Sequence, residues 1–256
     1  MKIGFVTDIH EDIANLEYAL ELLHDENCDE IICLGDIVGF TIPFYKNITS
    51  RDADACVESI INNCSRVVIG NHDLYSIKKV PFNKAGFEYG ENWYSLDYET
   101  RSRRSRNKIW LYEDSEIPCT LSQESILFLS SLSETAVINS INNSFFISHF
   151  CHPDFSGSSI QFPTEGFHLK NHLSFTESNG CVLSFSGHGH PEGCLIGNPE
   201  KIYSLGFGIH DIKNEPQWIV APSIARTSRK NGVLIFDSYK MQLKILIKLL
   251  LNNSLK

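Results

Sequence analysis

Five short stretches of the chain place carboxylate, imidazole and amide groups in an order that suits a site for two metal ions. They are Asp8-Ile9-His10, Gly35-Asp36, Gly70-Asn71-His72-Asp73, His149 and Gly187-His188-Gly189-His190. Carboxylates and imidazoles together are typical ligands of manganese, iron, zinc and nickel. A carboxylate shared between two divalent ions holds them about 3.5 to 4 Å apart, which lets a bridging hydroxide attack phosphorus. The pattern therefore predicts metal-assisted hydrolysis of a phosphate ester.

The residue types suggest how the ligands divide. Asp8 and His10 are two residues apart and can point to the same cation, while Asp36 offers the carboxylate that bridges two ions. Because a single glycine separates His188 from His190, their side chains can diverge around a tight turn and reach different ions. The remaining donors for the two sites are Asn71 and His149.

His72 follows a predicted ligand, and we assign it a catalytic role as donor of a hydrogen bond or proton to the phosphate or the departing oxygen. Asp73 either orients His72 or is a carboxylate at a helix N-terminus with no chemical role.

Each motif also has a purely structural explanation. An Asp after a strand is commonly a helix cap, a lone His is usually structural, and a Gly-Asn pair is often a turn. The ordered combination favours a metal site, because all of these structural explanations would have to coincide.

The first three motifs follow apolar runs of strand character. KIGFVT precedes Asp8, IICL precedes Gly35-Asp36 and RVVI precedes Gly70-Asn71. Since ligands of open α/β sheets gather beyond the carboxyl ends of the strands, these residues are expected to share one pocket. Helical spacing of apolar residues predicts helices from Asp12 to about His24 and over Asp52–Asn63 between the strands.

The second half of the chain is expected to differ from the first. The region at about 74–135 is aromatic and charged, and we interpret it as an inserted substrate-capping region with short helices such as SQESILFLSSL. Strands then return in quick succession and end in a hairpin between GVLIFD and MQLKILIKL, whose last part could instead be helical. We predict one domain over residues 1–256.

Composition limits the function classes. With 42% hydrophobic and 21% charged residues, the chain is typical of a globular protein. The net charge of −9 argues against nucleic acid as a partner but is compatible with a small phosphorylated substrate, since bound cations reverse the local field. We expect no secretory signal, no membrane span and a cytoplasmic location. The oligomeric state stays open.

Together the five blocks resemble the signature of the calcineurin-like metallophosphoesterases, which runs DxH, GDxxx, GNH(D/E), a lone His and GHxH. The resemblance spans roughly residues 2–191 and continues more loosely through APSIARTSRKNGVLIFD. The compact size is similar to the small bacterial phosphodiesterase branch. This resemblance implies an α/β fold, a four-layer αββα sandwich of two mixed sheets flanked by helices.

The resemblance also implies which ligand belongs to which ion. Asp8, His10, Asp36 and His190 would hold one metal, and Asp36, Asn71, His149 and His188 the other, with His72 facing the phosphate. The implied cofactors are two divalent ions, for which manganese is favoured over iron, zinc, nickel and magnesium. Arg226 and Arg229 belong to a loop that approaches the pocket in this family, and we expect them to contact the substrate phosphate.

Two departures from the family pattern stand out. Gly39-Phe40 occupies the place of an Asp-Arg pair in the protein-phosphatase branch, so a carboxylate that would orient His72 and a phosphate-binding arginine are both missing there. Phosphoproteins are therefore disfavoured as substrates. Gly189 stands where related small enzymes often carry Thr, and we expect it to alter packing more than chemistry.

Hydrolysis of phosphodiesters is the first choice of function. The alternatives are a phosphomonoesterase acting on a nucleotide or small phosphorylated metabolite, and a protein-binding scaffold without catalysis. Two remaining features are interpreted as surface positions: the arginine run over residues 101–106 and the pair His168 and His172 at helical spacing.

Overall fold

A computed structural model describes residues 1–139 and 144–247. Its strands form two six-stranded sheets and one two-stranded sheet. In spatial order the first sheet contains β11 (Gly208–Asp211), β14 (Gln242–Ile247), β13 (Gly232–Asp237), β1 (Lys2–Val6), β2 (Glu30–Cys33) and β4 (Arg66–Val67). The second contains β10 (Ile202–Leu205), β9 (Cys194–Gly197), β12 (Gln217–Val220), β8 (Leu183–Ser186), β7 (Ser144–Ser148) and β6 (Thr135–Asn139). The small sheet pairs β3 (Phe40–Thr41) with β5 (Glu116–Ile117).

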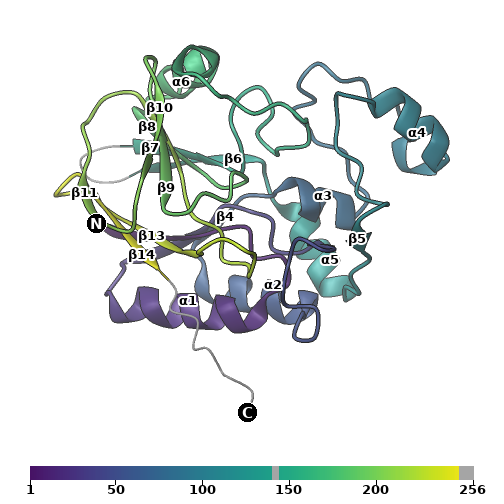
Figure 1. The fold of residues 1–256 in the computed structure, drawn as a ribbon, viewed down its shortest axis with the longest axis horizontal. Coiled ribbons are helices and arrows are strands. Elements are labelled where there is room, and N and C mark those ends of the chain that lie inside the picture. Colours follow the sequence, from purple (N-terminus) through teal and green to yellow (C-terminus); the bar gives the residue numbers. More distant parts are fainter. Residues whose placement is uncertain (140–143, 248–256) are drawn as a thin grey trace.

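Helices cover the outer faces of both large sheets. The helices of the described residues are α1 (Ile13–Asp25), α2 (Ala53–Asn63), α3 (Asn71–Ser76), α4 (Tyr98–Ser105), α5 (Gln123–Ser131) and α6 (Lys170–Ser178), with short 3₁₀ helices η1 (Trp93–Ser95) and η2 (Gly166–Leu169). α1 and α2 lie below the first sheet in Figure 1, and α6 lies above the second. The layers therefore run helix, sheet, sheet, helix, and both sheets mix parallel with antiparallel pairs. The predicted α/β sandwich is confirmed.

The main core lies between the two sheets and is rich in phenylalanine. Phe5 of β1 stacks on Phe185 of β8 with ring centroids 4.5 Å apart, and Phe145 meets both rings edge-on. Phe236 of β13 contacts Phe185 at 5.2 Å. Close packing of such large buried rings holds the two sheets, and so their strand ends, in a fixed relation.

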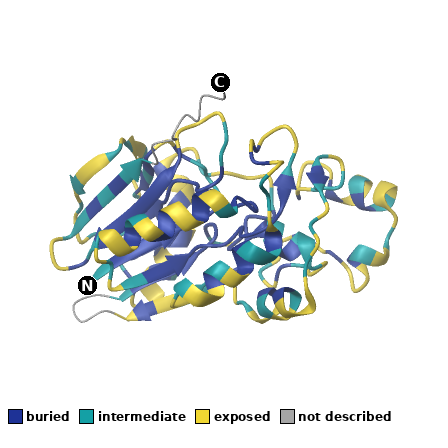
Figure 2. Cartoon of the chain, turned by 90° about the horizontal axis from the view of Figure 1, so that it is seen from below, coloured by how far each residue is buried: buried dark blue, intermediate teal, exposed yellow. Residues whose placement is uncertain are grey.

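α1 illustrates how local sequence gives this packing. The Asp12 side chain caps the helix by accepting from the backbone N–H of Asn15. Leu16, Leu20 and Leu23 recur at helical spacing and are buried against the first sheet, while the opposite face is exposed, as Figure 2 shows. The helices predicted from Asp12 and over Asp52–Asn63 are confirmed as α1 and α2.

The strands end at one edge of the molecule. β1, β2 and β4 are mutually parallel and lead into Asp8, Asp36 and Asn71. In the second sheet β7 and β8 are parallel and lead into His149 and His188. Because parallel strands carry their carboxyl ends to the same edge, residues more than 100 positions apart in the sequence are placed together.

Some of the other sequence predictions are confirmed, and some strands were not predicted. The terminal hairpin is confirmed by the pairing of β13 with β14, and SQESILFLSSL contains α5. The alternative that the last part of this hairpin is helical is wrong for Gln242–Ile247, which form β14, and its remainder lies outside the described residues. β3, β5, β9 and β11 were not predicted.

Among the described helices, none has the length and apolar character that a membrane span requires. The division of the chain into one domain over residues 1–256, with a substrate-capping insertion at about 74–135, stays a prediction.

The interpretation of His172 as a surface residue was wrong. This α6 side chain is fully buried on the second sheet, where its Nδ1 accepts from the His152 backbone N–H and its Nε2 contacts Ser184 Oγ at 2.8 Å. Burial, with a smaller contribution from His152, lowers the pKa of His172 to about 3. His168 is exposed, as expected, and its Nδ1 accepts backbone N–H groups at the start of η2.

Acidification should destabilise the fold through His172. The unfolded state takes up a proton on this ring below about pH 6.5 and the folded state does not, so stability falls as the pH decreases through that value. Between pH 7 and pH 5 this one group is expected to remove about 2 kcal/mol from the free energy of unfolding. Urea denaturation of wild type and His172→Gln at both pH values measures the difference.

His172→Gln should have a lower free energy of unfolding than wild type at pH 7, but should lose less of it between pH 7 and pH 5. His168→Gln, which removes an exposed histidine, serves as the control and should keep the wild-type pH dependence. An identical loss of stability in all three proteins would contradict the assignment.

Candidate metal centre

The structure brings the predicted histidine and aspartate ligands together in two clusters. Asp8, His10 and His190 form one, and Asp36, His149 and His188 form the other, with the potential ligand atoms of each cluster within 4.8 Å of one another. Asn71 joins the second cluster, since its Oδ1 lies 3.1 Å from His188 Nδ1. A further grouping of His10, Asp36 and His72 connects the two.

The backbone at these positions is unusual. Five of the ligand residues have positive φ angles that residues with a side chain rarely adopt: Asp8 at 52°, His10 at 46°, Asp36 at 54°, His188 at 64° and His190 at 45°. Such conformations cost of order 1–3 kcal/mol each and cluster at functional sites. The turn after β8 was expected to use the freedom of Gly189, but the positive φ angles fall on the two histidines instead.

Backbone carbonyls fix the orientation of two rings. The Leu34 carbonyl accepts from His149 Nδ1 at 2.7 Å, and the Gly39 carbonyl accepts from His10 Nδ1 at 2.8 Å. Since a carbonyl can only accept, Nδ1 carries the proton in each ring and the lone pair of the neutral form lies on Nε2. Both Nε2 atoms are buried; that of His10 lacks a hydrogen-bond partner among the described residues, whereas that of His149 faces Asp36 Oδ2 at 3.1 Å. This arrangement is typical of histidines that bind metal through Nε2.

The carboxylates face these nitrogens. Asp36 Oδ2 lies 3.1 Å from His149 Nε2, and Asp8 Oδ1 lies 2.9 Å from His190 Nε2. Burial would raise the pKa of both aspartates, but His190 beside Asp8 and His149 beside Asp36 hold each pKa well below its ordinary value. Asp36 outweighs the effect of burial on His149 and raises the pKa of this ring to about 10, so that without a cation its Nε2 carries a proton facing Asp36. A bound cation would take the place of that proton, and carboxylates with imidazole nitrogens are the donor set that a divalent transition metal prefers.

Asp73 supports the turn that carries Asp36. Its carboxylate accepts from the backbone N–H groups of Asp36, Ile37, Val38 and Gly70 at 2.8 to 3.1 Å. Gly70 is needed here for space, because a Cβ at this position would lie 2.2 Å from Asp36 Oδ1. Asp73 thus lies behind a ligand and not beside the ring of His72, where its possible orienting role had been predicted.

The residue that contacts the His72 ring is Glu116. Its Oε2 lies 2.7 Å from His72 Nδ1, and the pair is largely buried. Asp36 and Glu116 outweigh the effect of burial and raise the pKa of His72 to about 9. A Cβ at Gly39 would point into the His72 side chain at 2.6 Å, so the orienting carboxylate cannot come from there in this geometry. β5 supplies it instead.

Sequence reasoning missed Glu116 because no motif marks it. It lies in the charged stretch Glu113-Asp114-Ser115-Glu116, where solvent exposure is the ordinary expectation. In the structure, the pairing of β5 with β3 directly after Gly39 sets Glu116 opposite Thr41, and no signal in the sequence indicates this pairing.

The two arginines have different surroundings. Arg226 donates from Nε and Nη2 to the Asp12 carboxylate at 2.8 and 2.7 Å, and Nη2 also donates to Ser50 Oγ. Its guanidinium therefore joins the cap of α1 to the neighbouring loops, which leaves it poorly placed for the predicted substrate contact. Arg229 lines the cavity beside the metal centre and donates to the His190 carbonyl at 3.1 Å.

The metal centre opens into a cavity of about 410 Å³. Tyr45 stacks on His10 at 4.2 Å, and Tyr112 packs on His72 at 4.4 Å. The Tyr112 hydroxyl also accepts from Asn71 Nδ2, which turns the amide oxygen toward His188. Neither tyrosine was singled out from the sequence, because their position depends on the loops folding back over the strand ends.

The model of the calcineurin-like phosphoesterase family matches residues 1–192, and the chain belongs to this family. All the clustered ligands lie inside the matched segment.

Individual relatives are more distant. Phosphodiesterase MJ0936 of Methanocaldococcus jannaschii is 37% identical over 52 residues, which are 20% of this chain and 31% of that protein, so the match spans about a third of the curated relative. The crystal structure of a metallophosphoesterase from Sphaerobacter thermophilus is similar with a TM-score of 0.64 and 20% identity, covering 96% of this chain and 87% of that one. A hypothetical protein of Pyrococcus horikoshii has a TM-score of 0.57 and 14% identity over the same shares. These structures support the fold.

Manganese binding should stabilise the protein through Asp36. At a concentration about 100 times its dissociation constant, a ligand adds about 2.7 kcal/mol, which corresponds to a rise of roughly 5–10 °C in melting temperature for a chain of this size. Differential scanning fluorimetry with EDTA and then with excess Mn²⁺ measures the shift.

Asp36→Asn, which removes the carboxylate common to two groupings, should lose most of the shift. Asp25→Asn, an exposed change at the end of α1, is the matched control and should retain it. Equal shifts in both variants would place the bound manganese elsewhere.

Proposed function

We propose that this protein hydrolyses phosphodiesters at a site for two divalent ions, for which manganese is favoured. The observation that carries the proposal is that Asp36 belongs to a ligand cluster with His149 and His188 and also to a grouping with His10. A carboxylate in that position suits the bridging of two ions.

The residues divide between the ions as the family resemblance implies. Asp8, His10 and His190 would hold the first, Asn71, His149 and His188 the second, and Asp36 would serve both. When bound, such ions supply Lewis acids for the phosphoryl oxygens and lower the pKa of water. The buried Nε2 of His10, which has no hydrogen-bond partner among the described residues, and the buried Nε2 of His149, which faces Asp36, support this assignment.

His72 has the proton-transfer role in the proposed reaction. Glu116 accepts from the Nδ1–H of His72, so the second proton of the charged ring is on Nε2. Water adds to phosphorus and gives up one proton to solvent, the bond from phosphorus to one ester oxygen breaks, and that oxygen takes the proton from Nε2 as it leaves. Neutral His72 then takes up a proton from solvent and returns to its charged form. Glu116 is a positioning residue, since it acts on the substrate through His72.

The walls of the cavity favour a diester over a monoester. Beyond the ligands it is lined by Phe44, Trp110 and Leu111, which offer apolar contact to a substituent on the second ester oxygen. A small phosphorylated molecule as the partner is also consistent with the acidic chain, because the attraction comes from bound cations and Arg229.

Hydrolysis assays with excess Mn²⁺ test the proposal. The protein should hydrolyse bis-p-nitrophenyl phosphate with a higher kcat/KM than p-nitrophenyl phosphate, and EDTA should abolish both activities. His72→Ala should lower kcat by about 10²–10⁴-fold, the usual contribution of a general acid. A reversed preference would favour the phosphomonoesterase alternative. Hydrolysis of neither compound, by a protein that still binds manganese, would favour a scaffold.

Loss of the Glu116 carboxylate should affect substrates according to their leaving group. Glu116→Gln is expected to lower kcat/KM for diphenyl phosphate about tenfold more than for bis-p-nitrophenyl phosphate, because phenolate needs a proton from His72 more than p-nitrophenolate does. Glu116→Asp should recover part of the loss.

Glu124→Gln, an exposed change in the first turn of α5, is the control and should resemble wild type. A loss in Glu116→Gln that is the same for both diesters would indicate a purely structural role for Glu116.

A further inference from the structure

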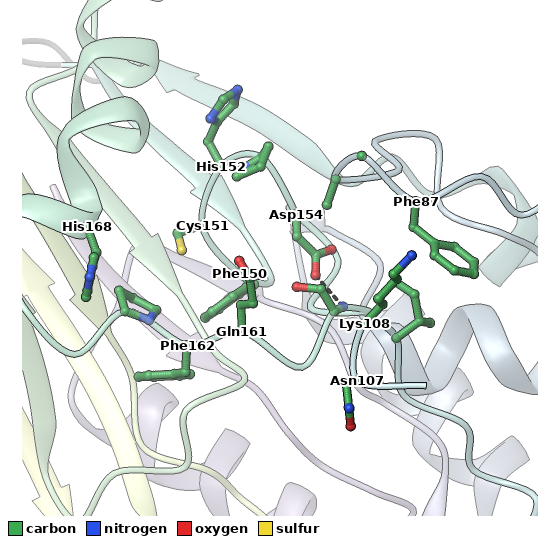
Figure 3. Close-up of a pocket in the computed structure, with 16 residues that line it drawn as sticks. Phe87, Asn107, Lys108, Phe150, Cys151, His152, Asp154, Gln161, Phe162 and His168 are labelled. Atoms are coloured by element: carbon green, nitrogen blue, oxygen red, sulfur yellow. Dashed lines mark hydrogen bonds between the residues drawn. The ribbon is translucent and has the colours of Figure 1, made fainter. Parts of the chain in front are cut away.

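A second cavity of about 500 Å³ lies beside the metal centre, between the inserted region and the loop that follows β7. Figure 3 shows its two sides, with Phe87 and Lys108 facing Phe162 and His168 across the opening. The proposed hydrolysis assigns no role to these residues.

Two contacts show that this cavity lies next to the cavity at the candidate metal centre, which is called the catalytic cavity below. Phe162 lines it and also packs against the glycine between His188 and His190, since a Cβ on Gly189 would lie 3.2 Å from the Phe162 ring. The glycine that departs from the family pattern therefore leaves room for Phe162. Phe150, which also lines the second cavity, lies with its ring centroid 4.7 Å from that of His188.

The inserted region runs past both cavities. Ile109 forms an antiparallel bridge with Ser159, which fixes this segment against the loop after β7. Lys108 and Ile109 line the second cavity, and Trp110, the next residue, lines the catalytic one. The two cavities are therefore neighbours along this stretch of chain, which places a group held in the second cavity near a phosphate at the candidate metal centre.

The lining suits a flat ring that carries polar edge groups. Phe87 and Phe150 are buried and make part of the lining apolar, whereas Phe162 keeps 39% of its surface exposed and offers a ring for stacking. Asn107 and Gln161 at the rim carry exposed amides, which pair with the donors and acceptors on the edge of a heteroaromatic base.

The charged groups of the second cavity favour an occupant with carbonyl or phosphate oxygens over a cationic one. Asp154 is the buried acid of the lining, but its carboxylate accepts from the backbone N–H groups of residues 157, 158 and 159 and from Ser156. These four donors compensate its charge, which weakens its attraction for a cationic headgroup such as choline. Lys108 adds an exposed ammonium that favours carbonyl or phosphate oxygens.

We propose that the second cavity binds the planar heteroaromatic base of a nucleoside phosphodiester whose phosphate lies at the metal centre. This inference rests on the proposed phosphodiesterase function and specifies its substrate class. It concerns a single nucleotide ester and not a nucleic-acid polymer, which the charge of −9 disfavours.

Two esters with the same leaving group test it. With excess Mn²⁺, the p-nitrophenyl ester of thymidine 5′-monophosphate should have a kcat/KM at least about tenfold above that of methyl p-nitrophenyl phosphate, as expected from stacking of one base. Phe162→Leu, which keeps an apolar group against Gly189, and Gln161→Ala should reduce this ratio toward one. Phe82→Leu, which alters a phenylalanine that is 89% exposed and outside both cavities, should leave the ratio unchanged.

The outcomes separate the two proposals. Hydrolysis of neither ester would overturn the phosphodiesterase function. Hydrolysis of both with equal kcat/KM, or the wild-type ratio in both Phe162→Leu and Gln161→Ala, would overturn the base site alone. Crystals soaked with thymidine 5′-monophosphate give a readout without turnover: density for the base against Phe162 is expected, and a base bound elsewhere would refute the assignment.

Discussion

Two ionised carboxylates held almost entirely out of water are the constraint around which this protein is organised. Asp8 and Asp36 are 0% and 1% exposed. An isolated buried carboxylate would cost several kcal/mol, so each must be compensated by hydrogen bonds and positive charge. The His188 backbone N–H and Thr7 Oγ1 donate to Asp8, and the His72 backbone N–H donates to Asp36. The remaining negative charge is directed at the histidines, which is the condition for holding cations.

This compensation explains features that otherwise appear unrelated. The positive φ angles turn the ligand side chains from the sheet ends toward a common point, and Asp73 stabilises one such turn through four backbone N–H donors. The stacking of Phe5 on Phe185 holds β1 against β8. Because this core is closely packed, the turns that follow the two strands cannot easily move to less strained backbone conformations. Strain at the centre is thus balanced by a rigid core.

The segment over residues 74–135 contributes to the site as much as the sheets do. The strand ends supply the candidate ligands, whereas this segment supplies Glu116 against His72, Tyr112 against Asn71 and the stretch that lies between the two cavities. Family membership rests on the ligand motifs, and solved relatives of 20% identity or less inform only the fold. Differences in substrate within such a family are therefore expected to arise from segments of this kind.

The amino-acid sequence by itself determined the ligands, the strands that carry them and the first two helices. These follow from local chemistry: apolar runs end in Asp8, Asp36 and Asn71, and the periodicity of Leu16, Leu20 and Leu23 needs only its own helix. Tertiary structure alone decided that Glu116 rather than Asp73 holds His72, that Arg226 binds Asp12, and that His172 is buried. Each of these depends on a partner far away in the sequence, which comes near only when the sheets pack and the loops close over their ends. No pattern within the residues themselves specifies such a partner.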